Sequence, residues 1–270
     1  MKHFLITMAA CAMLCGCTQE WGELETVTYP INQPYTELEV SDGFVVEGYE
    51  RNEYHRPGGA IVTVGEKAQS KVRAEVKNGR LYIGFRSGKF DRGGEAAVVS
   101  LPTDELTKLN KLVLREASRT EYANMILLRD IVLKDASSCE TTIMAPYNSE
   151  QVLEGQLNID ASDASSFFSQ AYISNINITL SGASNVRMIG RECEELSINV
   201  SGASNLDCGD LFSSNVSGYV KDASKTKVKC CSSLSVDVTD ASELVYQLIS
   251  PNCQLDYNCH WSGGSTITEK

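Results

Sequence analysis

A short segment that recurs through the second half of the chain constrains its fold more than any other feature. Ser181-Gly182-Ala183-Ser184-Asn185 is followed, 20 residues later, by Ser201-Gly202-Ala203-Ser204-Asn205. Alignment on the central small residue extends the series to eight copies, which stand 18–28 residues apart. A repeat of this period indicates one supersecondary unit that stacks on copies of itself. The central residues of the eight copies are Ala117, Ala136, Ala164, Ala183, Ala203, Ala223, Ala241 and Gly264.

Apolar residues keep fixed positions around each central residue. In the copy at Ala203, Ile198 and Val200 precede it at alternate positions and Leu206 follows it by three residues. The alternation predicts a strand with one buried face, and the jump to the third residue predicts a corner after which a new strand begins. Gly or Asp stands before most of the central residues, which suits a turn. We expect the central Ala to point from this corner into a narrow part of the core.

This spacing predicts an all-β chain. Such short units cannot bury their own apolar face, so they must stack, and stacking in one register predicts a β-helix-like solenoid of about eight coils over residues 106–267. An antiparallel sandwich is the alternative, because turn signals roughly 8–12 residues apart also suit that fold. Residues 35–105 are predicted to be an N-terminal region of short strands, in which Asn78-Gly79 forms a hairpin turn. The longest interval between copies predicts a loop insertion over residues 145–156.

The N-terminus has the features of an export signal. A positively charged start precedes an apolar run over residues 4–14 that is too short to span a bilayer. Leu14-Cys15-Gly16-Cys17 resembles a bacterial lipobox, which implies a signal peptide over residues 1–16, a lipid on Cys17 and anchoring to a membrane by that lipid. The alternative is an ordinary secretory signal with an incidental Cys. The polar segment 17–34 has no periodicity and is predicted to be a tether.

The net charge and the cysteine content limit which partners, metals and disulfides the chain is expected to have. The net charge of -11 at pH 7 argues against a nucleic-acid partner, which favours a basic face. Of ten cysteines, seven lie beyond Cys17. Seven cannot all pair within one chain, and no Cys-x-x-Cys spacing suggests a zinc or redox site. We therefore predict no metal, no cofactor, and mostly buried thiols with at most one disulfide formed in an oxidising envelope.

The repeat also aligns serines that invite interpretation as nucleophiles. A serine nucleophile needs a general base and a group that orients the base. Beyond the signal segment the chain has only His55 and His260, and neither lies in a recognisable motif. We interpret the serines as a hydroxyl ladder that satisfies backbone groups at the corners. The aligned serines are Ser118, Ser137, Ser165, Ser184, Ser204, Ser224, Ser242 and Ser265.

Carboxylates and tyrosines offer two further candidates. Aspartates from neighbouring corners could stand about 5–9 Å apart, as glycoside cleavage requires, or could bind calcium. Gly182 and Gly202 take the same position in other copies, which favours turn geometry instead. Tyrosines could form a sugar-binding face, although several fall at core positions of the alternation, so packing is the default interpretation. The aspartates are Asp135, Asp163, Asp222 and Asp240; the tyrosines are Tyr49, Tyr54, Tyr82, Tyr122, Tyr172, Tyr219, Tyr246 and Tyr257.

The repeats and their flanking segments together resemble the auto-transporter adhesin head GIN domain family, which is common in lipoproteins of the Bacteroidetes. The similarity covers residues 35–267, nearly the whole chain after the tether, and treats them as one domain. The segments that carry it are Leu38-Glu39-Val40-Ser41-Asp42-Gly43-Phe44-Val45-Val46, Asn78-Gly79-Arg80-Leu81-Tyr82-Ile83, Ser100-Leu101-Pro102, Val200-Ser201-Gly202-Ala203-Ser204-Asn205-Leu206 and Trp261-Ser262-Gly263-Gly264-Ser265.

The resemblance implies a right-handed, parallel β-helix-like fold and an adhesin-like role, and it brings no catalytic residues. Together with the lipobox it implies a lipid-anchored protein of the cell envelope, on either face of the outer membrane. The expected function is binding of a protein or glycan ligand without catalysis. The alternative is a polysaccharide-active lyase or hydrolase, because β-helices host such enzymes, although a fold alone does not establish an activity.

Overall fold

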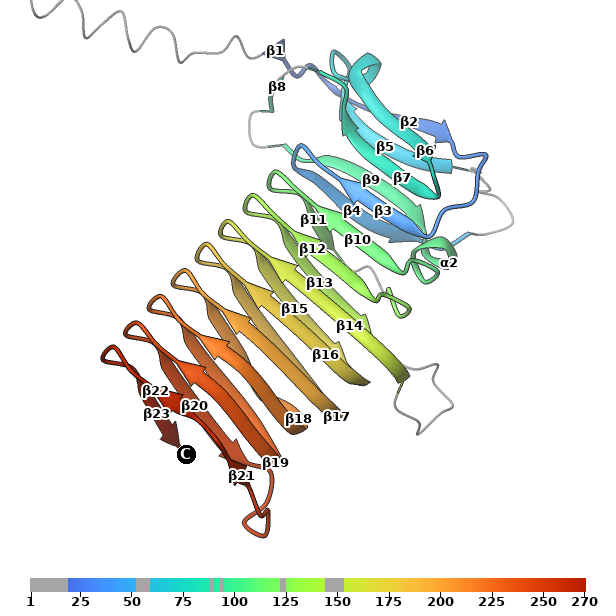
Figure 1. Ribbon diagram of the computed structural model, residues 1–270. Coiled ribbons are helices and arrows are strands. Elements are labelled where there is room, and N and C mark those ends of the chain that lie inside the picture. The colour runs from blue at the N-terminus through green and yellow to red at the C-terminus, as the bar shows by residue number, and fades with distance from the viewer. Residues whose placement is uncertain (1–18, 52–58, 88–89, 93–94, 122–124, 144–152) are drawn as a thin grey trace, which may run out of the picture.

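The computed structural model describes residues 19–270 apart from 52–58, 88–89, 93–94, 122–124 and 144–152 (Figure 1). The predicted signal segment, Cys17 and much of the predicted loop insertion therefore lie outside the described residues. The described chain is all-β with almost no helix, and 21 strands join in one mostly parallel sheet that wraps around an elongated core. The helical segments are a 3-10 turn (Gln69–Lys71) and α2 (Thr103–Leu106). Neither described helix is long and apolar enough to cross a membrane.

The strands divide into an N-terminal group, β1 to β9, and a repeat group, β10 to β23. In the first group are β1 (Gln19–Glu20), β2 (Leu24–Pro30), β3 (Glu37–Val40), β4 (Phe44–Tyr49), β5 (Gly59–Gly65), β6 (Val72–Lys77), β7 (Arg80–Phe85), β8 (Phe90–Asp91) and β9 (Ala97–Pro102). In the second are β10 (Lys111–Leu114), β11 (Arg119–Glu121), β12 (Asp130–Leu133), β13 (Ser138–Ile143), β14 (Leu153–Ala161), β15 (Ser166–Ala171), β16 (Ile173–Leu180), β17 (Asn185–Val200), β18 (Asn205–Val220), β19 (Lys225–Val238), β20 (Glu243–Leu248), β21 (Asp256–Tyr257), β22 (His260–Trp261) and β23 (Thr266–Glu269).

Two parallel ladders run through the repeats. Ladder A joins β3, β10, β12, β14 and β16 to the C-terminal halves of β17, β18 and β19. Ladder B joins β4, β11, β13 and β15 to the N-terminal halves of β17, β18 and β19, and then to β20 and β23. Each copy of the repeat supplies one strand to each ladder. In ladder A the residues that stand five positions before the central residue of each copy pair with one another and form one column. That column is Leu112, Ile131, Ile159, Ile178 and Ile198.

The corner that leads from ladder A to ladder B has the same backbone geometry in all eight copies. At Gly182 and Ala183 φ is 63° and 65°, and the two equivalent residues of every other copy also have positive φ. Two successive residues with positive φ are the pattern of a type I′ turn. The Ala183 N–H donates to the Gly202 carbonyl of the next corner at 2.8 Å, and the equivalent bond recurs from Ala117 to Ala241. The corners therefore form a hydrogen-bonded column of their own.

The central Ala of the corner does not enter the core, which corrects our expectation. Ala183 and Ala203 are exposed, and the buried residue of each corner is the Ser that follows. Backbone strain explains the small side chain better than core packing does. At φ near 60° the Cβ atom approaches the following carbonyl oxygen, and this approach costs about 1–2 kcal/mol per residue and is worst for β-branched side chains.

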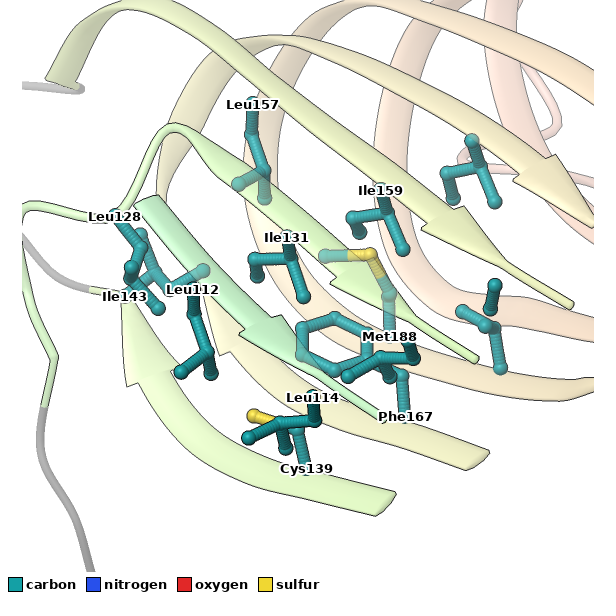
Figure 2. Close-up of a cluster of buried hydrophobic side chains, with 14 of the residues drawn as sticks. Leu112, Leu114, Leu128, Ile131, Cys139, Ile143, Leu157, Ile159, Phe167 and Met188 are labelled. Atoms are coloured by element: carbon teal, nitrogen blue, oxygen red, sulfur yellow. The ribbon is translucent and has the colours of Figure 1, made fainter. Parts of the chain in front are cut away.

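The core lies between the two ladders along the whole stack. Figure 2 shows Leu112, Ile131 and Ile159 of ladder A close to Cys139 and Phe167 of ladder B. All five side chains are at most 3% exposed. Full burial of such a side chain stabilises a fold by about 1.5–3 kcal/mol. The alternation found in the sequence therefore corresponds to one continuous interior.

A further corner precedes the eight that the sequence reveals. Ser41-Asp42-Gly43 has φ of 60° at Asp42 and 67° at Gly43. Its flanking strands β3 and β4 pair in parallel with β10 and β11, in the register of the repeats. The stack therefore begins inside residues 35–105, which we expected to be a separate region of short strands. This corner lacks the Ala-Ser pair, so alignment on that pair does not find it.

Antiparallel strands close the N-terminal end of the sheet. β2 pairs with β5, β5 with β9, and β6 with β7. Asn78-Gly79 joins β6 to β7, and both residues have positive φ, as the predicted hairpin turn requires. Trp21, Phe85 and Phe90 pack with ring centroids 5.0–6.1 Å apart. The Arg92 guanidinium lies 5.3 Å from the Trp21 ring, so an aromatic cluster covers the core at this end.

The predicted tether over residues 17–34 is structured in its second half. Leu24–Pro30 forms β2, and the Trp21 side chain is only 4% exposed. β2 is an edge strand with most of its residues exposed on both faces, so it shows none of the alternation by which a half-buried strand is recognised. Pro30 stands at the end of this edge strand, a position that tolerates the missing N–H.

Cysteines in the described chain are mostly buried, with one disulfide. Cys231 and Cys253 are bonded, with Cα atoms 5.2 Å apart. Burial raises the pKa of the Cys139 and Cys193 thiols to about 12. Thiols of such high pKa are unreactive at neutral pH and pack as small apolar groups. The unpaired cysteines are Cys139, Cys193, Cys208, Cys230 and Cys259.

Candidate binding surface

The aligned serines form hydrogen bonds that hold successive corners together. The Ser184 N–H donates to Ser204 Oγ at 3.2 Å, and the Ser204 N–H donates to Ser224 Oγ at 3.3 Å. The same bond links Ser224 to Ser242 and Ser242 to Ser265. The Ser184 hydroxyl also donates to a carbonyl of its own corner at 2.8 Å. From Ser184 onward these hydroxyls are engaged in bonds between corners, whereas Ser118 Oγ at the first corner is buried without a hydrogen-bond partner among the described residues.

His260 is the histidine that the described part of the chain contains, and its ring pairs with a carboxylate away from the serine ladder. His260 Nδ1 lies 3.4 Å from Asp237 Oδ1, and both side chains are exposed. His55 lies outside the described residues. The constellation that a serine nucleophile needs is therefore not assembled in the part of the chain that the structure describes.

The corner carboxylates are exposed, and the backbone carbonyls of the same residues receive the corner hydrogen bonds. Burial raises the pKa of Glu116, which takes the equivalent position in the first corner, and the nearby Asp42 carboxylate raises it further. Gly182 and Gly202 interrupt the row. Among the described residues, no group of three or more His, Cys, Asp or Glu side chains could hold a metal ion. The row consists of Asp135, Asp163, Asp222 and Asp240.

The outward face of ladder A is a better candidate for a ligand-binding surface than the corners are. The repeat does not fix the residues at its outward positions. In the ladder A segments of β14, β16, β17, β18 and β19, the two outward residues nearest each corner are hydroxyls, amides, two carboxylates and one phenol, and none of them is Lys or Arg. We call this face the polar strip. It comprises Asn158, Asp160, Asn177, Thr179, Ser197, Asn199, Ser217, Tyr219, Ser235 and Asp237.

Amide side chains of this face are held in place by bonds between strands. Asn177 Nδ2 donates to Asn158 Oδ1 at 3.0 Å, and Asn158 Nδ2 donates to Asp130 Oδ1 at 2.8 Å. Further along, Asn215 Nδ2 donates to Glu195 Oε1 at 2.7 Å. Such bonds fix donors and acceptors before a ligand arrives, which lowers the entropy cost of binding.

A shallow groove of about 250 Å³ lies at the N-terminal part of the strip. Lys111, Asp130 and Asp160 contribute charged groups to it, and Asn158 and Asn177 contribute amides. The Asp130 carboxylate already accepts the Asn158 amide. The groove therefore combines charged groups, amides and a hydroxyl with apolar atoms of Ile131, Val132 and Ile159.

Tyr219 supplies the aromatic group of the strip. It is 48% exposed, and its register places it between Asn199 of β17 and Asp237 of β19. An exposed ring flanked by an amide and a carboxylate can stack on an apolar face of a ligand while its neighbours form hydrogen bonds. Of the tyrosines considered from the sequence, Tyr82 instead packs under Arg73 at 4.2 Å.

The larger recess of about 510 Å³ beside α2 is a weaker candidate. Arg51 and Lys108, which line it, are paired with Asp104 and Glu105 at 3.2–3.7 Å. Tyr35 also lines it, and burial raises the pKa of that phenol. Because its charged side chains are compensated within the protein, this recess offers no free charge among its described lining residues.

Known proteins are similar to this chain in sequence and in fold. The family model described as "Putative auto-transporter adhesin, head GIN domain" matches residues 34–247. A search of curated proteins found no match. Among solved structures, a "putative adhesin" of Parabacteroides merdae is similar with a TM-score of 0.69 and 15% identity, over 94% of this chain and 99% of that one.

Two further structures share the fold. A "putative lipid binding protein" of Parabacteroides distasonis has a TM-score of 0.70 and 14% identity, over 94% of this chain and 100% of that one. A "putative adhesin" of Bacteroides fragilis has a TM-score of 0.56 and 12% identity, over 93% and 100%. With its family model matched across most of its length, this chain belongs to the auto-transporter adhesin head GIN domain family.

Proposed function

We propose that the protein is a lipid-anchored binding module of the cell envelope, and that the polar strip binds a neutral, hydroxyl-rich glycan. Membership of an adhesin-like family supports a binding role. The observation that carries the ligand class is the composition of the strip, with its ordered amides, hydroxyls, exposed Tyr219 and no basic residue. Apart from Lys111 at the end of the groove, the charged groups that a polyanionic ligand would meet there are carboxylates, so an uncharged polymer fits better.

A glycan array probed with the purified protein tests this assignment. Asn177→Ala and Tyr219→Ala should each lower the binding of neutral glycans by about tenfold, which corresponds to one lost hydrogen bond or stacking contact. Asn205→Ala is the matched control, because Asn205 belongs to a similar amide pair on ladder B, where its Nδ2 lies 2.9 Å from Asn185 Oδ1. Equal losses in all three variants, or binding to a protein ligand only, would contradict the glycan assignment.

The anchor is proposed at Cys17, after a signal peptide over residues 1–16, with the domain over residues 35–267. The lipobox-like Leu14-Cys15-Gly16-Cys17 supports this arrangement. The disulfide between Cys231 and Cys253 is compatible with an oxidising envelope. Radiolabelled palmitate should enter the wild type and not Cys17→Ser, and label in the variant would disprove the assignment.

We further propose that the stack is a right-handed β-helix of about eight coils. The eight equivalent corners and the constant register of the two ladders support it. The extra corner at Ser41-Asp42-Gly43 would add one coil to that number. A crystal structure in which the chain advances with a left-handed sense, or in which the ladders are antiparallel, would refute this.

The second candidate function is polysaccharide cleavage, and the groove of the strip is the observation in its favour. Asp130 and Asp160 line it together with Lys111. Hydrolase and lyase assays on neutral and acidic polysaccharides, with Asp130→Asn and Asp160→Asn beside Asp222→Ala, decide between the candidates. Turnover that either groove variant abolishes would replace binding with catalysis; turnover lost in Asp222→Ala would place the chemistry at the corners.

A further inference from the structure

The C-terminal end of the sheet exposes residues that stand in register with the core. In ladder A, Tyr257 pairs with Leu234 and Trp261 pairs with Val238. Leu234 and Val238 are 0% exposed, whereas Tyr257 is 43% and Trp261 59% exposed. These two rings therefore occupy positions that are covered by the next strand elsewhere in the stack.

The backbone at this end is also unpaired on one side. In the part of the chain that the structure describes, β21 and β22 pair only with β19, and β23 pairs only with β20. Free N–H and C=O groups on such an edge can pair with another strand, and natural edges are usually protected by charges. The edge strand β6 at the other end carries Arg73, Glu75 and Lys77. The C-terminal edge carries Asp256 and His260 but also two exposed aromatic rings, Tyr257 and Trp261.

We propose that this edge is the interface of a homodimer, in which β21 and β22 of two copies run antiparallel. A complementary pair of hydrogen-bonding groups, the Asp256 carboxylate and the His260 imidazole, selects a second copy as the partner, because His260 Nδ1 faces Asp237 of its own chain and leaves Nε2 for the other copy. Asp256 and His260 stand two residues to either side of Asn258, and all three are exposed. Antiparallel pairing centred on Asn258 places Asp256 of each copy opposite His260 of the other. A parallel arrangement would oppose the two Asp256 carboxylates.

The rings of the two copies supply the apolar centre of this interface. Trp and Tyr are the side chains that most often anchor protein interfaces, and twofold symmetry presents the same patch from both sides. Covering Trp261 and Tyr257 restores the burial that their register has in the rest of the stack. The residues of the polar strip in β14 to β18 do not belong to the paired edge strands, so the dimer does not cover them.

Covalent trapping in cells tests the interface on the full chain. Residues that face each other in an antiparallel pair have Cα atoms about 4.5–5.5 Å apart, which a disulfide can bridge. Asn258→Cys should therefore give a covalent dimer on a non-reducing gel. Ser217→Cys, an exposed serine on the outward face of β18, is the control and should stay monomeric.

Removal of the aromatic anchor completes the test. Trp261→Asp in the Asn258→Cys background should lower the yield of covalent dimer by about tenfold or more. Asp256→Lys should lower it as well, and Asp256→Lys with His260→Asp should restore it. The exposed position of Trp261 means that the variant should unfold at the wild-type temperature, which circular dichroism checks. No dimer from Asn258→Cys, a dimer from Ser217→Cys, or a dimer that survives Trp261→Asp would overturn the proposal.

Discussion

The two kinds of turn that connect the ladders contrast sharply. The corner from ladder A to ladder B repeats one φ pattern, one N–H to carbonyl bond and one serine bond in successive copies. The opposite turn, from ladder B back to ladder A, has register shifts that differ in each copy. Shifts occur between Arg187 and Ile189, between Gly190 and Cys193, and between Cys208 and Phe212. The corners along one edge of the stack therefore share one geometry, whereas the turns along the opposite edge differ from one another.

The irregular edge uses stabilising features that the repeats do not. A Cβ atom on Gly190 would lie 1.9 Å from the Ala171 carbonyl oxygen, so only Gly fits between the strands there. The disulfide joins Cys231 to Cys253 across a sequence separation of 22 residues. Insertions are tolerated at this edge because additional residues extend away from the stack and leave the ladders in register. The difference indicates that the corner edge sets the register while the opposite edge accommodates variation.

The largest effect that separates the two edges should come from Gly190→Ala. Overpacking against a backbone carbonyl that belongs to a ladder strand should lower the free energy of unfolding by about 3 kcal/mol. Gly264→Ala is the matched control at the corner edge, where a Cβ atom meets nothing within 4 Å and the other seven copies carry Ala. Urea denaturation measures both. Equal losses would mean that the two edges constrain the backbone alike.

Removal of the disulfide should come next in size. Closing a loop of this length stabilises a fold by about 3 kcal/mol in the chain-entropy account. Cys231→Ser with Cys253→Ser should therefore unfold at lower urea than the oxidised wild type, and the two proteins should unfold alike in the presence of a reductant. A double variant as stable as the oxidised wild type would show that the disulfide is incidental to the irregular edge.

A smaller effect should follow from a β-branched side chain at a corner. Ala203 is exposed and has φ of 59°, so Ala203→Val fills no cavity and adds only strain. The expected loss is about 1–2 kcal/mol. Ala203→Gly removes the Cβ atom and should show no such loss. Thermal unfolding of the two variants distinguishes strain from packing, because a packing role would make the Gly variant the less stable one.

The same contrast explains what could be predicted from the sequence. The corners, the alternating strands and the buried third residue after each Ala could be located, because identical local requirements recur and leave an identical pattern. The burial of Ser204 in place of Ala203 could not, since sequence spacing does not reveal which of two adjacent small residues faces inward. β2 and the corner at Asp42 were missed because neither contains the Ala-Ser pair on which the copies were aligned.

The polar strip also could not be predicted from the sequence. Its residues stand at the outward positions of alternating strands, where no packing requirement repeats, so nothing marks them as a set until the register is known. Asn177 and Asn158 are 19 residues apart in the chain, yet their side chains are hydrogen bonded. Tyr219 was one of eight tyrosines with equal claims, and only its 48% exposure separates it from the packed ones.

The repeated serines belong to the architecture of the fold. Urea denaturation of Ser204→Ala and Ser217→Ala tests this role, because Ser204 closes the corner that leads into β18 and Ser217 lies in β18 itself. Ser204 is 1% exposed and accepts the Ser184 N–H, so its loss leaves a buried donor unpaired and should cost about 1–3 kcal/mol. Ser217 is exposed and should change stability by less than about 0.5 kcal/mol. Equal stability of the two variants would contradict the account.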